Sequence, residues 1–208
     1  MEENSTQVNQ LSKVEIKRKY IHLASIAIPI IYYFISFATF FVFFGAILAI
    51  WAFIDMQRQK KPEIKLMLDR YFGDLFRESE ATTYSGATYL GIGMLLTAIF
   101  FSKHTAIMAM SILAICDSVA SLVGLRYGHI RIGDKTLEGS AGFFVSGLMI
   151  VCCLIWLFGF KAIFLWENII ALALTCAAEL YSKKLKINDN ILIPLIYSIV
   201  VSILETAL

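Results

Sequence analysis

The chain has 208 residues, of which 59% are hydrophobic and 16% are charged. A soluble globular domain is about half apolar and about a quarter charged, so this composition excludes an ordinary soluble enzyme and indicates an integral membrane protein. The net charge of +2 is small, and no nucleic-acid partner is expected.

The chain begins with a polar and basic tail, residues 1–19, for which we expect no cleaved signal peptide because no small-residue cleavage pattern follows it. Residues 20–208 are interpreted as a single transmembrane domain. Their apolar segments predict an all-α polytopic membrane protein with about seven transmembrane helices, given that a helix needs roughly 20 residues to cross a bilayer. The predicted spans are residues 20–37, 39–54, 83–101, 104–122, 138–158, 162–180 and 191–207.

Several features of the first 82 residues bear on the arrangement of these spans. Pro29 predicts a kink in the first span, and the first two spans are so close in sequence that they form a tight helical hairpin. Residues 56–82 are the longest polar stretch, with apolar and charged side chains interleaved. From Pro62 onward this stretch predicts an amphipathic helix on the cytoplasmic membrane surface. Trp51 and Asp55 are interpreted as residues at the membrane boundary.

The orientation follows from lysine and arginine, which favour cytoplasmic loops. Four of them lie in the tail, six in residues 56–82, three in residues 125–137 and three in residues 181–190, which makes 16 of 18 on one side. Only Lys103 and Lys161 lie on the other side. We therefore expect the N-terminus in the cytoplasm and the C-terminus on the far side.

The stretch 116–140 is the first candidate for a site. It carries Asp117 at the end of one span and Glu138 at the start of the next, on neighbouring helices and at the same expected membrane depth. A carboxylate at a membrane boundary is costly, so a pair of them indicates function. Lys135, Arg126 and Arg131 lie between them, and this combination suits a phosphate and a divalent cation.

The predicted topology brings further polar groups to the same cytoplasmic face. They are Arg18, Lys19, His22, Ser85, Thr88, Glu179, Asp189 and Asn190. Ser85 and Thr88 open a helix, where free backbone N–H groups can bind an anion, although plain N-capping explains them equally well. The Asp189-Asn190 pair is also suited to a helix N-cap.

The chemistry that needs such a set is phosphoryl or nucleotidyl transfer, in which lysine, arginine and a divalent cation neutralise phosphate charge. The chain has neither the P-loop motif nor the glycine-rich loop of protein kinases, and it lacks the common hydrolase, zinc and redox motifs. A transporter or a non-catalytic membrane scaffold stays open as an alternative. In a transporter, however, the polar residues should line the middle of the spans.

Several of these motifs resemble the signature of the CTP-dependent lipid-alcohol kinases, the family of dolichol kinase, phytol kinase and the yeast-type diacylglycerol kinase. The resemblance rests on five motifs between about residues 17 and 200, in which Thr136 stands where many relatives have serine. They are Arg18-Lys19 with His22, Ser85 to Thr88, Asp117 to Gly124 with Tyr127-Gly128, Lys135 to Ser140, and Glu179 followed by Asp189-Asn190. The phosphatidate cytidylyltransferases share a weaker version, and a CTP:lipid-phosphate cytidylyltransferase is the alternative enzyme.

The resemblance implies transfer of the γ-phosphate of CTP to a membrane lipid alcohol, with Mg²⁺ or another divalent cation, in a multi-pass protein whose active site faces the cytoplasm. A polyprenol, dolichol or phytol is favoured as the substrate and diacylglycerol is possible, while the oligomeric state is open. The implied catalytic residues are Asp117, Lys135, Glu138 and Glu179, with Glu179 as the candidate for handling the hydroxyl proton. The implied nucleotide-binding residues are Arg18, Lys19, His22, Ser85, Thr88, Arg126, Arg131, Lys135, Thr136, Gly139, Ser140 and Asn190. The implied metal ligands are Asp117, Glu138 and Asp189.

Overall fold

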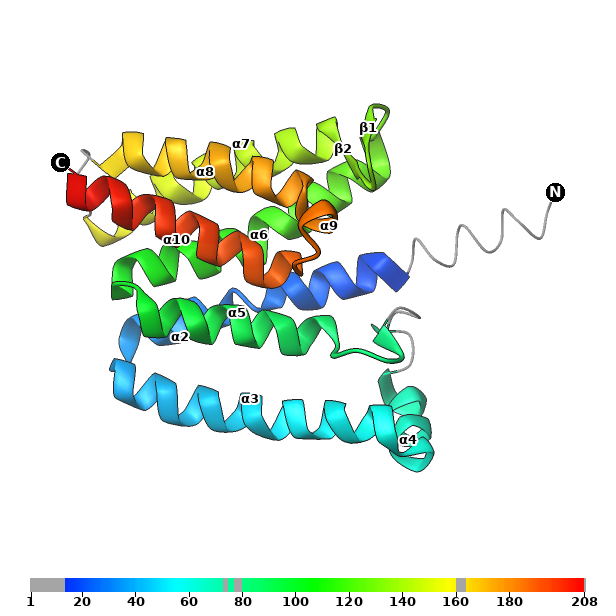
Figure 1. Ribbon diagram of the computed structural model, residues 1–208. Helices are drawn as coiled ribbons and strands as arrows, with labels where there is room; N and C mark the ends of the chain where they lie inside the picture. Colours follow the sequence, from blue (N-terminus) through cyan, green and yellow to red (C-terminus); the bar gives the residue numbers. More distant parts are fainter. Residues whose placement is uncertain (1–13, 73–74, 77–79, 160–163, 208) are drawn as a thin grey trace.

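The computed structural model describes residues 14–72, 75–76, 80–159 and 164–207, which form a bundle of helices lying side by side (Figure 1). The first 13 residues of the predicted tail, Lys161, and residues 73–74 and 77–79 of the predicted surface segment lie outside this part. Within it, the only strands are two of two residues each. The expected all-α membrane fold is therefore confirmed.

The elements follow the chain in a simple order. Residues 14–24 are helical and carry no label in Figure 1. The labelled helices are α2 (Ala27–Phe34), α3 (Phe37–Lys60), α4 (Pro62–Phe72), α5 (Gly86–Phe100), α6 (Lys103–Tyr127), α7 (Leu137–Phe158), α8 (Phe164–Leu180), α9 (Ser182–Leu185) and α10 (Asp189–Ala207). The strands β1 (Arg131–Ile132) and β2 (Lys135–Thr136) separate α6 from α7.

Among the described residues, four helices are long and apolar enough to cross a membrane, namely α3, α6, α7 and α10. The apolar helix α5 is shorter, with 15 residues, and α8 has 17. The predicted count of seven spans and the cytoplasmic N-terminus stay predictions, because length and composition alone decide neither.

The first predicted span is divided into two helices, residues 14–24 and α2, by a turn at residues 25–26. Pro29 explains the position of the break. It has no N–H to donate to the carbonyl of Ser25, four residues earlier, and its ring crowds that carbonyl. The Ser25 carbonyl instead accepts from the N–H of Ile28 at 2.9 Å, which tightens the chain into the turn.

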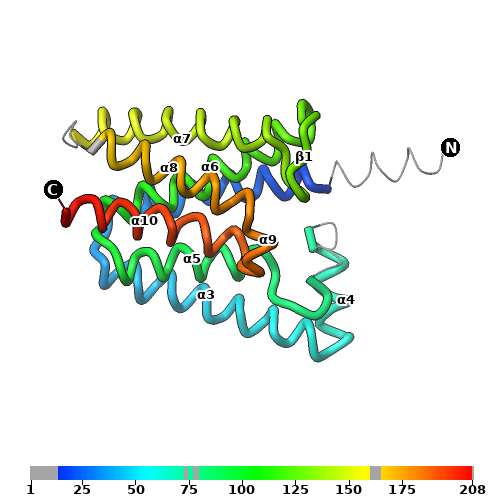
Figure 2. The backbone as a smooth tube through the Cα atoms, turned by 45° about the horizontal axis from the view of Figure 1, so that its top comes forward, coloured from blue at the N-terminus to red at the C-terminus, as the bar shows by residue number. Residues whose placement is uncertain are grey.

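The helical hairpin of the first two spans is present, with Ile35 and Ser36 as the connection between α2 and α3. The second span is longer than expected, because α3 continues past Ile54 to Lys60. The amphipathic helix begins at Pro62, as expected, and ends at Phe72. Figures 1 and 2 show that α4 turns away from the axis of α3 at the end of the bundle.

The centre of the bundle is α6. Within an apolar stretch of 18 residues of this helix, 72% is buried inside the protein. It packs against α7, α10, α2 and α5. The approach of α7 is especially close, since a side chain at Gly139 would lie 2.8 Å from the carbonyl oxygen of Ala120. Small residues allow two membrane helices to come this near.

The predicted polar loop between the fourth and fifth spans is wrong in detail. Helix α6 runs on to Tyr127, and most of the remainder is an antiparallel hairpin in which Arg131 pairs with Thr136 and Ile132 with Lys135. Gly133, with a φ of 64°, takes the first loop position, which type II′ hairpin turns give to glycine. The hairpin fixes the direction of Lys135, which a free loop would not do.

The polar segments gather at one end of the bundle. The β-hairpin, α9, α4 and residues 14–24 all lie on the right in Figure 1, whereas the C-terminus of α10 lies at the opposite end. The arrangement agrees with the expected convergence of the charged motifs on one face.

We expect Gly93→Ala to destabilise the protein by about 1–3 kcal/mol, the usual cost of overpacking a close contact. A side chain at position 93 would collide with the backbone carbonyl of Asn190, which cannot move without shifting α10. Thermal unfolding in detergent measures the effect. The matched control is Gly45→Ala, also inside a helix, where no atom lies within 4 Å of the added methyl group. This control should be neutral or stabilising by up to about 1 kcal/mol, and equal losses in both variants would contradict the close packing of α5 on α10.

Candidate active site

Asp117 lies near the middle of the buried helix α6, with a side chain that is 2% exposed. Its Oδ2 accepts a hydrogen bond from the ammonium of Lys19 at 2.6 Å, and Nε2 of His22 lies 3.6 Å from the same oxygen. Because Lys19 and His22 are one turn apart on the helical residues 14–24, this segment supplies both partners. The other oxygen, Oδ1, is buried and has no hydrogen-bond partner.

The orientation of His22 is fixed by its second contact. Its Nε2 lies 3.1 Å from the carbonyl oxygen of Leu113, one turn before Asp117 on α6. A carbonyl can only accept, so Nε2 carries the proton and the imidazole is held edge-on to α6.

Lys135 forms the centre of a second charged cluster, at the edge of the β-hairpin. Its ammonium donates to Oε1 of Glu179, at the end of α8, and to Oδ2 of Asp189, at the start of α10, the latter at 3.2 Å. Burial works against its charge, but the carboxylates of Asp189, Glu179 and Asp117 outweigh burial and raise the pKa of Lys135 above its ordinary value. Lys135 therefore stays an ammonium at any physiological pH. The second oxygen of Glu179, Oε2, is buried and unpartnered.

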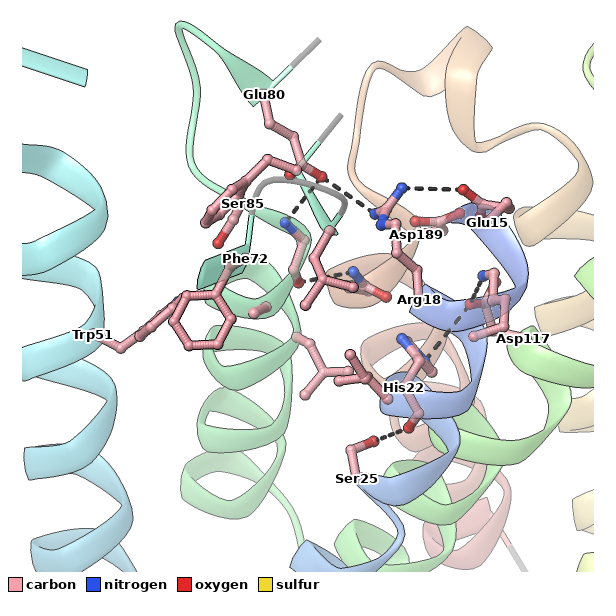
Figure 3. A pocket seen from close by; sticks show the side chains of 18 residues that line it. Glu15, Arg18, His22, Ser25, Trp51, Phe72, Glu80, Ser85, Asp117 and Asp189 are labelled. Carbon is pink, nitrogen blue, oxygen red and sulfur yellow. Dashed lines mark hydrogen bonds and ion pairs between the residues drawn. The ribbon is translucent and has the colours of Figure 1, made fainter. Parts of the chain in front are cut away.

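The two clusters meet at a cavity of about 350 Å³, which Asp117 and Asp189 both line (Figure 3). Its other polar lining residues are Glu15, Arg18, Lys19, His22, Ser25, Glu80, Ser85, Gly86 and Asn190. Its apolar lining residues are Ile21, Trp51, Phe72, Leu75, Phe76, Ala87 and Leu90. Glu179 is not among the lining residues, so it acts on the cavity only through Lys135.

Glu80 holds one wall of the cavity in place. Its Oε1 accepts from Arg18 at 3.3 Å and from the N–H of Gly86 at 3.2 Å. The amide of Asn190 donates to the carbonyl of Gly86 at 3.0 Å, which ties α10 to the same point. Arg18 also pairs with Glu15 at 3.1 Å, so its charge is shared between two carboxylates. Sequence reasoning did not single out Glu80 or Glu15.

Asp55 is not a simple boundary residue, as the sequence suggested. Its carboxylate, 1% exposed, accepts from Nε of Arg58 at 2.8 Å, from the N–H of Ser85 at 2.6 Å and from the hydroxyl of Thr88 at 2.6 Å. Arg58 also donates to the carbonyl oxygens of Glu80 and Thr83 at 2.8 and 3.1 Å. This buried pair clamps the end of α3 to the start of α5. The spacing of Asp55 and Arg58, one helical turn apart, was the signal available in the sequence.

The Asp55 contacts also bear on Ser85 and Thr88 as predicted nucleotide ligands. The Ser85 N–H and the Thr88 hydroxyl bind Asp55, and the Gly86 N–H binds Glu80. The start of α5 therefore already carries two of the protein's own carboxylates. The arrangement favours a structural role for Ser85 and Thr88 over anion binding.

Glu138 differs from its expected place beside Asp117. Its carboxylate accepts from the N–H of Ile130 at 3.2 Å and closes the base of the β-hairpin. The neighbouring Gly139 faces Ala120, one turn further along α6 than Asp117, and α6 extends beyond Asp117 by ten residues before the hairpin begins. Glu138 therefore does not lie beside Asp117, and the shared membrane depth of the two carboxylates stays a prediction.

The remaining predicted ligands of the 116–140 stretch have mixed surroundings. Thr136 caps α7 by accepting from the N–H of Gly139 at 3.1 Å. Ser140 has a buried hydroxyl with no partner. Arg126 and Arg131 are exposed around the hairpin, with the guanidinium of Arg126 over the ring of Tyr127. In the hairpin Arg131 pairs with Thr136 and Lys135 with Ile132, so the side chains of Arg131 and Lys135 point to opposite faces.

The cap of α10 also differs from the expectation. Asn188, and not the Asp189-Asn190 pair, provides it, since the side-chain oxygen of Asn188 accepts from the N–H of Asn190 at 3.0 Å. Asp189 and Asn190 are thereby free of the capping role and point their side chains to Lys135 and Gly86.

The carboxylates around the cavity fit a divalent cation only if substrate phosphates complete its coordination. The described residues contain no group of three or more His, Cys, Asp or Glu side chains that could hold a metal by themselves. Magnesium, however, is commonly bound by one or two carboxylates together with substrate phosphates. Asp117, with its unpartnered Oδ1, and Asp189, at 30% exposure, are the carboxylates that fit this description. Glu138 faces the hairpin and does not.

Comparison with known proteins relates the chain to lipid kinases. It is 35% identical over 99 residues to CTP-dependent diacylglycerol kinase 1 of Eremothecium gossypii, which covers 46% of this chain and 31% of the kinase. It is 33% identical over 134 residues to dolichol kinase of Saccharomyces cerevisiae, which covers 63% of this chain and 25% of the kinase. The chain thus spans a third or less of the length of either kinase. No protein-family model and no solved structure matches it.

Over these segments the chain is similar to CTP-dependent diacylglycerol kinase and to dolichol kinase. Along most of its length it is similar to an uncharacterised protein of Rickettsia prowazekii, with 34% identity over 186 residues, which is 88% of this chain and 91% of that protein.

We expect Lys135→Gln to destabilise the protein by about 3 kcal/mol, the low end for removing one partner of a buried ion pair. The matched control is Lys183→Gln. Lys183 pairs with Asp134, and the two side chains are 73% and 58% exposed. The loss in the control should stay below about 1 kcal/mol. Chemical unfolding in detergent measures both.

The pH dependence of this difference follows from the raised pKa of Lys135. A raised pKa gives stability that is fully present below the lysine value of the unfolded chain, about 10.4, and is lost as the pH rises through the folded value. The gap between wild type and Lys135→Gln should therefore be constant from pH 7 to about 10 and shrink above it. A gap that already closes near pH 8 would show that Lys135 is not held as an ammonium by its carboxylates.

Proposed function

We propose that the protein transfers the γ-phosphoryl group of CTP to the hydroxyl of a membrane lipid alcohol. The observation that carries the proposal is the meeting of two lysine–carboxylate clusters, from four distant parts of the chain, at one cavity with an apolar end. The similarity to a kinase named as CTP-dependent supports the choice of donor. Relatives named for diacylglycerol and for dolichol support a lipid acceptor.

The proposed step is a direct displacement. The lipid hydroxyl oxygen attacks the γ-phosphorus, the bond between that phosphorus and the β–γ bridging oxygen breaks, and CDP leaves. The hydroxyl proton passes to a carboxylate. Phosphoryl transfer of this kind depends mainly on positioning and on neutralising the charge of the transferred group.

Lys135 is the proposed partner of the transferred phosphate. It projects from the hairpin, has a raised pKa and is therefore charged, and it reaches the rim of the cavity through Asp189. Arg126 and Arg131 are exposed around the hairpin and provide a basic approach for a nucleotide. Glu179 accepts a hydrogen bond from the Lys135 ammonium and thereby orients the lysine side chain. A cation bound by Asp189 and by phosphate oxygens would neutralise further charge when present.

Asp117 is the proposed acceptor of the hydroxyl proton, in place of Glu179. It lines the cavity, and its Oδ1 has no other partner, whereas Glu179 is separated from the cavity by Lys135. Lys19 holds the second oxygen at 2.6 Å, so the free one keeps a fixed direction. A carboxylate in such a position can orient or deprotonate an attacking hydroxyl.

The acceptor can be a polyprenol, dolichol, phytol or diacylglycerol, all of which present a hydroxyl at the end of a hydrophobic body. The predicted distribution of lysine and arginine puts the reaction at the cytoplasmic face. A thin-layer assay decides the substrate: the purified full-length protein, Mg²⁺ and γ-labelled CTP are incubated with each alcohol in turn. Label in one or more lipid phosphates is expected, with CDP as the second product. No transfer to any of the alcohols would refute the kinase function.

The same assay separates the alternatives. When a lipid phosphate replaces the alcohol, a CTP:lipid-phosphate cytidylyltransferase would release pyrophosphate and label the lipid only from α-labelled CTP. A transporter or a scaffold would give no labelled lipid, and equilibrium dialysis with CTP would detect no nucleotide binding to a scaffold.

We expect Asp117→Asn to lower kcat by about 10²–10⁴-fold, the usual contribution of a positioned acid or base. The amide keeps the shape of the side chain but cannot accept the proton. Asp69→Asn makes the same chemical change at an exposed position on α4 and should leave kcat within a factor of two of wild type. Circular dichroism checks that both variants are folded. A folded Asp117→Asn protein with wild-type kcat would sink the assignment.

A further inference from the structure

We propose that the cavity holds the lipid alcohol, with its hydroxyl at the Asp117 end and its first carbons at the apolar end, and that the chain leaves sideways between α3 and α5. The inference rests on the proposed function and adds the path of the substrate and the residues that select it. Trp51 and Leu90 are the specificity-determining residues that it assigns.

The cavity changes character from one end to the other. In Figure 3, Asp117 and His22 lie on the right, and Trp51 and Phe72 lie on the left. A molecule that fills it must be polar at one end and hydrocarbon at the other. A lipid alcohol has this form, and its hydroxyl would lie next to the free Oδ1 of Asp117.

The charge of the cavity favours an uncharged head over a nucleoside triphosphate. Its fixed cations are Arg18 and Lys19, and its carboxylates are Glu15, Glu80, Asp117 and Asp189. Even with a divalent cation at Asp117 and Asp189, the remaining charges cancel. Both cations are also already paired, Arg18 with two carboxylates and Lys19 with Asp117. A triphosphate of about four negative charges finds no surplus of positive charge here, whereas an alcohol needs none.

This assignment gives several residues that were predicted to bind the nucleotide a different role. Arg18, Lys19, His22 and Asn190 line the lipid cavity, and their ion pairs and hydrogen bonds shape its polar end. The nucleotide then approaches from the hairpin side, where Lys135 and the exposed arginines lie.

The contact between α3 and α5 closes the cavity toward the membrane core. A side chain at Gly91 would lie 2.6 Å from Cδ1 of Leu48, so the two helices touch at this level. Trp51 and Leu90 lie just above this contact, Trp51 one helical turn beyond Leu48. The first carbons of the lipid therefore cannot run straight down along the helices and must cross the bundle toward α3.

The apolar end gives access to the bilayer because α3 is the most outward of the long helices. Within an apolar stretch of 18 residues of α3, only 6% is buried inside the protein. Phe43, Ile47 and Ile50 are 67%, 65% and 62% exposed, as expected for a helix that faces lipid. Phe72, which lines the cavity from α4, is itself 44% exposed and marks where the cavity reaches the surface. A chain that passes Trp51 and Phe72 enters the hydrocarbon without meeting another helix.

Steady-state kinetics of three variants test the path. Trp51→Ala removes an apolar wall and Leu90→Phe fills the space, so each should raise the KM for the lipid alcohol about tenfold, within the range for a changed apolar pocket. The KM for CTP should stay within a factor of two. The control is Phe53→Ala, two residues from Trp51 and on the opposite face of α3, 57% exposed. It should change neither KM.

A photocrosslinking experiment on the wild-type protein tests the same idea without catalysis. An analogue of the alcohol with a diazirine within the first few carbons is irradiated in nanodiscs without CTP, and mass spectrometry locates the adducts. Adducts on α3, α4 and α5 around Trp51, Phe72 and Leu90 are expected, with competition by the unlabelled alcohol.

The outcomes separate this inference from the proposed function. Adducts at these positions in a protein without kinase activity would keep the lipid cavity and remove the kinase. Active protein with adducts only on the outer faces of α7 and α8, or variants that raise the KM for CTP and not for the lipid, would overturn the cavity assignment. The second of these results would identify the cavity as the nucleotide site.

Discussion

The structure depends on one requirement, that the carboxylate of Asp117 be compensated inside the central helix. Removing a carboxylate from water costs several kcal/mol unless a cation and hydrogen bonds replace the solvent. Lys19 meets this need from 98 residues away, at 2.6 Å. The first helical segment must therefore lie along α6, and the turn at residues 25–26 lets it do so while α2 continues at its own angle. The other oxygen of Asp117, a residue that lines the cavity, is left without a partner.

In the second cluster, around Lys135, a partly buried cation is compensated by carboxylates. Here one lysine serves two carboxylates, Glu179 and Asp189, so that the hairpin, α8 and α10 are joined at a single ammonium. The third buried pair, Asp55 with Arg58, carries no chemistry of its own but fixes the loop before α5, on which Glu80 lies. These three ionic clusters, together with the pair of Arg18 and Glu80, hold the walls of the cavity in place.

Much of this could be predicted from local rules. Proline marked the start of α4 and the break before α2, and the clustering of lysine and arginine indicated the face on which Asp117, Lys135 and Asp189 would meet. What could not be predicted depends on side chains reaching across the fold. The length of α6 beyond Asp117 moved Glu138 away from it, and the buried surroundings of Asp55 turned a boundary residue into a clamp. Asn188 took the capping role because only one residue can hold the position before the first turn.

The order of the charged residues along the chain has a consequence for how the protein is made. In each buried pair that joins distant segments at the site, the cation is synthesised first: Lys19 before Asp117, Arg18 before Glu80, and Lys135 before Glu179 and Asp189. A carboxylate that enters the membrane alone is costly. In this chain every such carboxylate leaves the ribosome after its partner, so the nascent protein can neutralise it during insertion. The last of them, Asp189, completes the site only when the final helix follows.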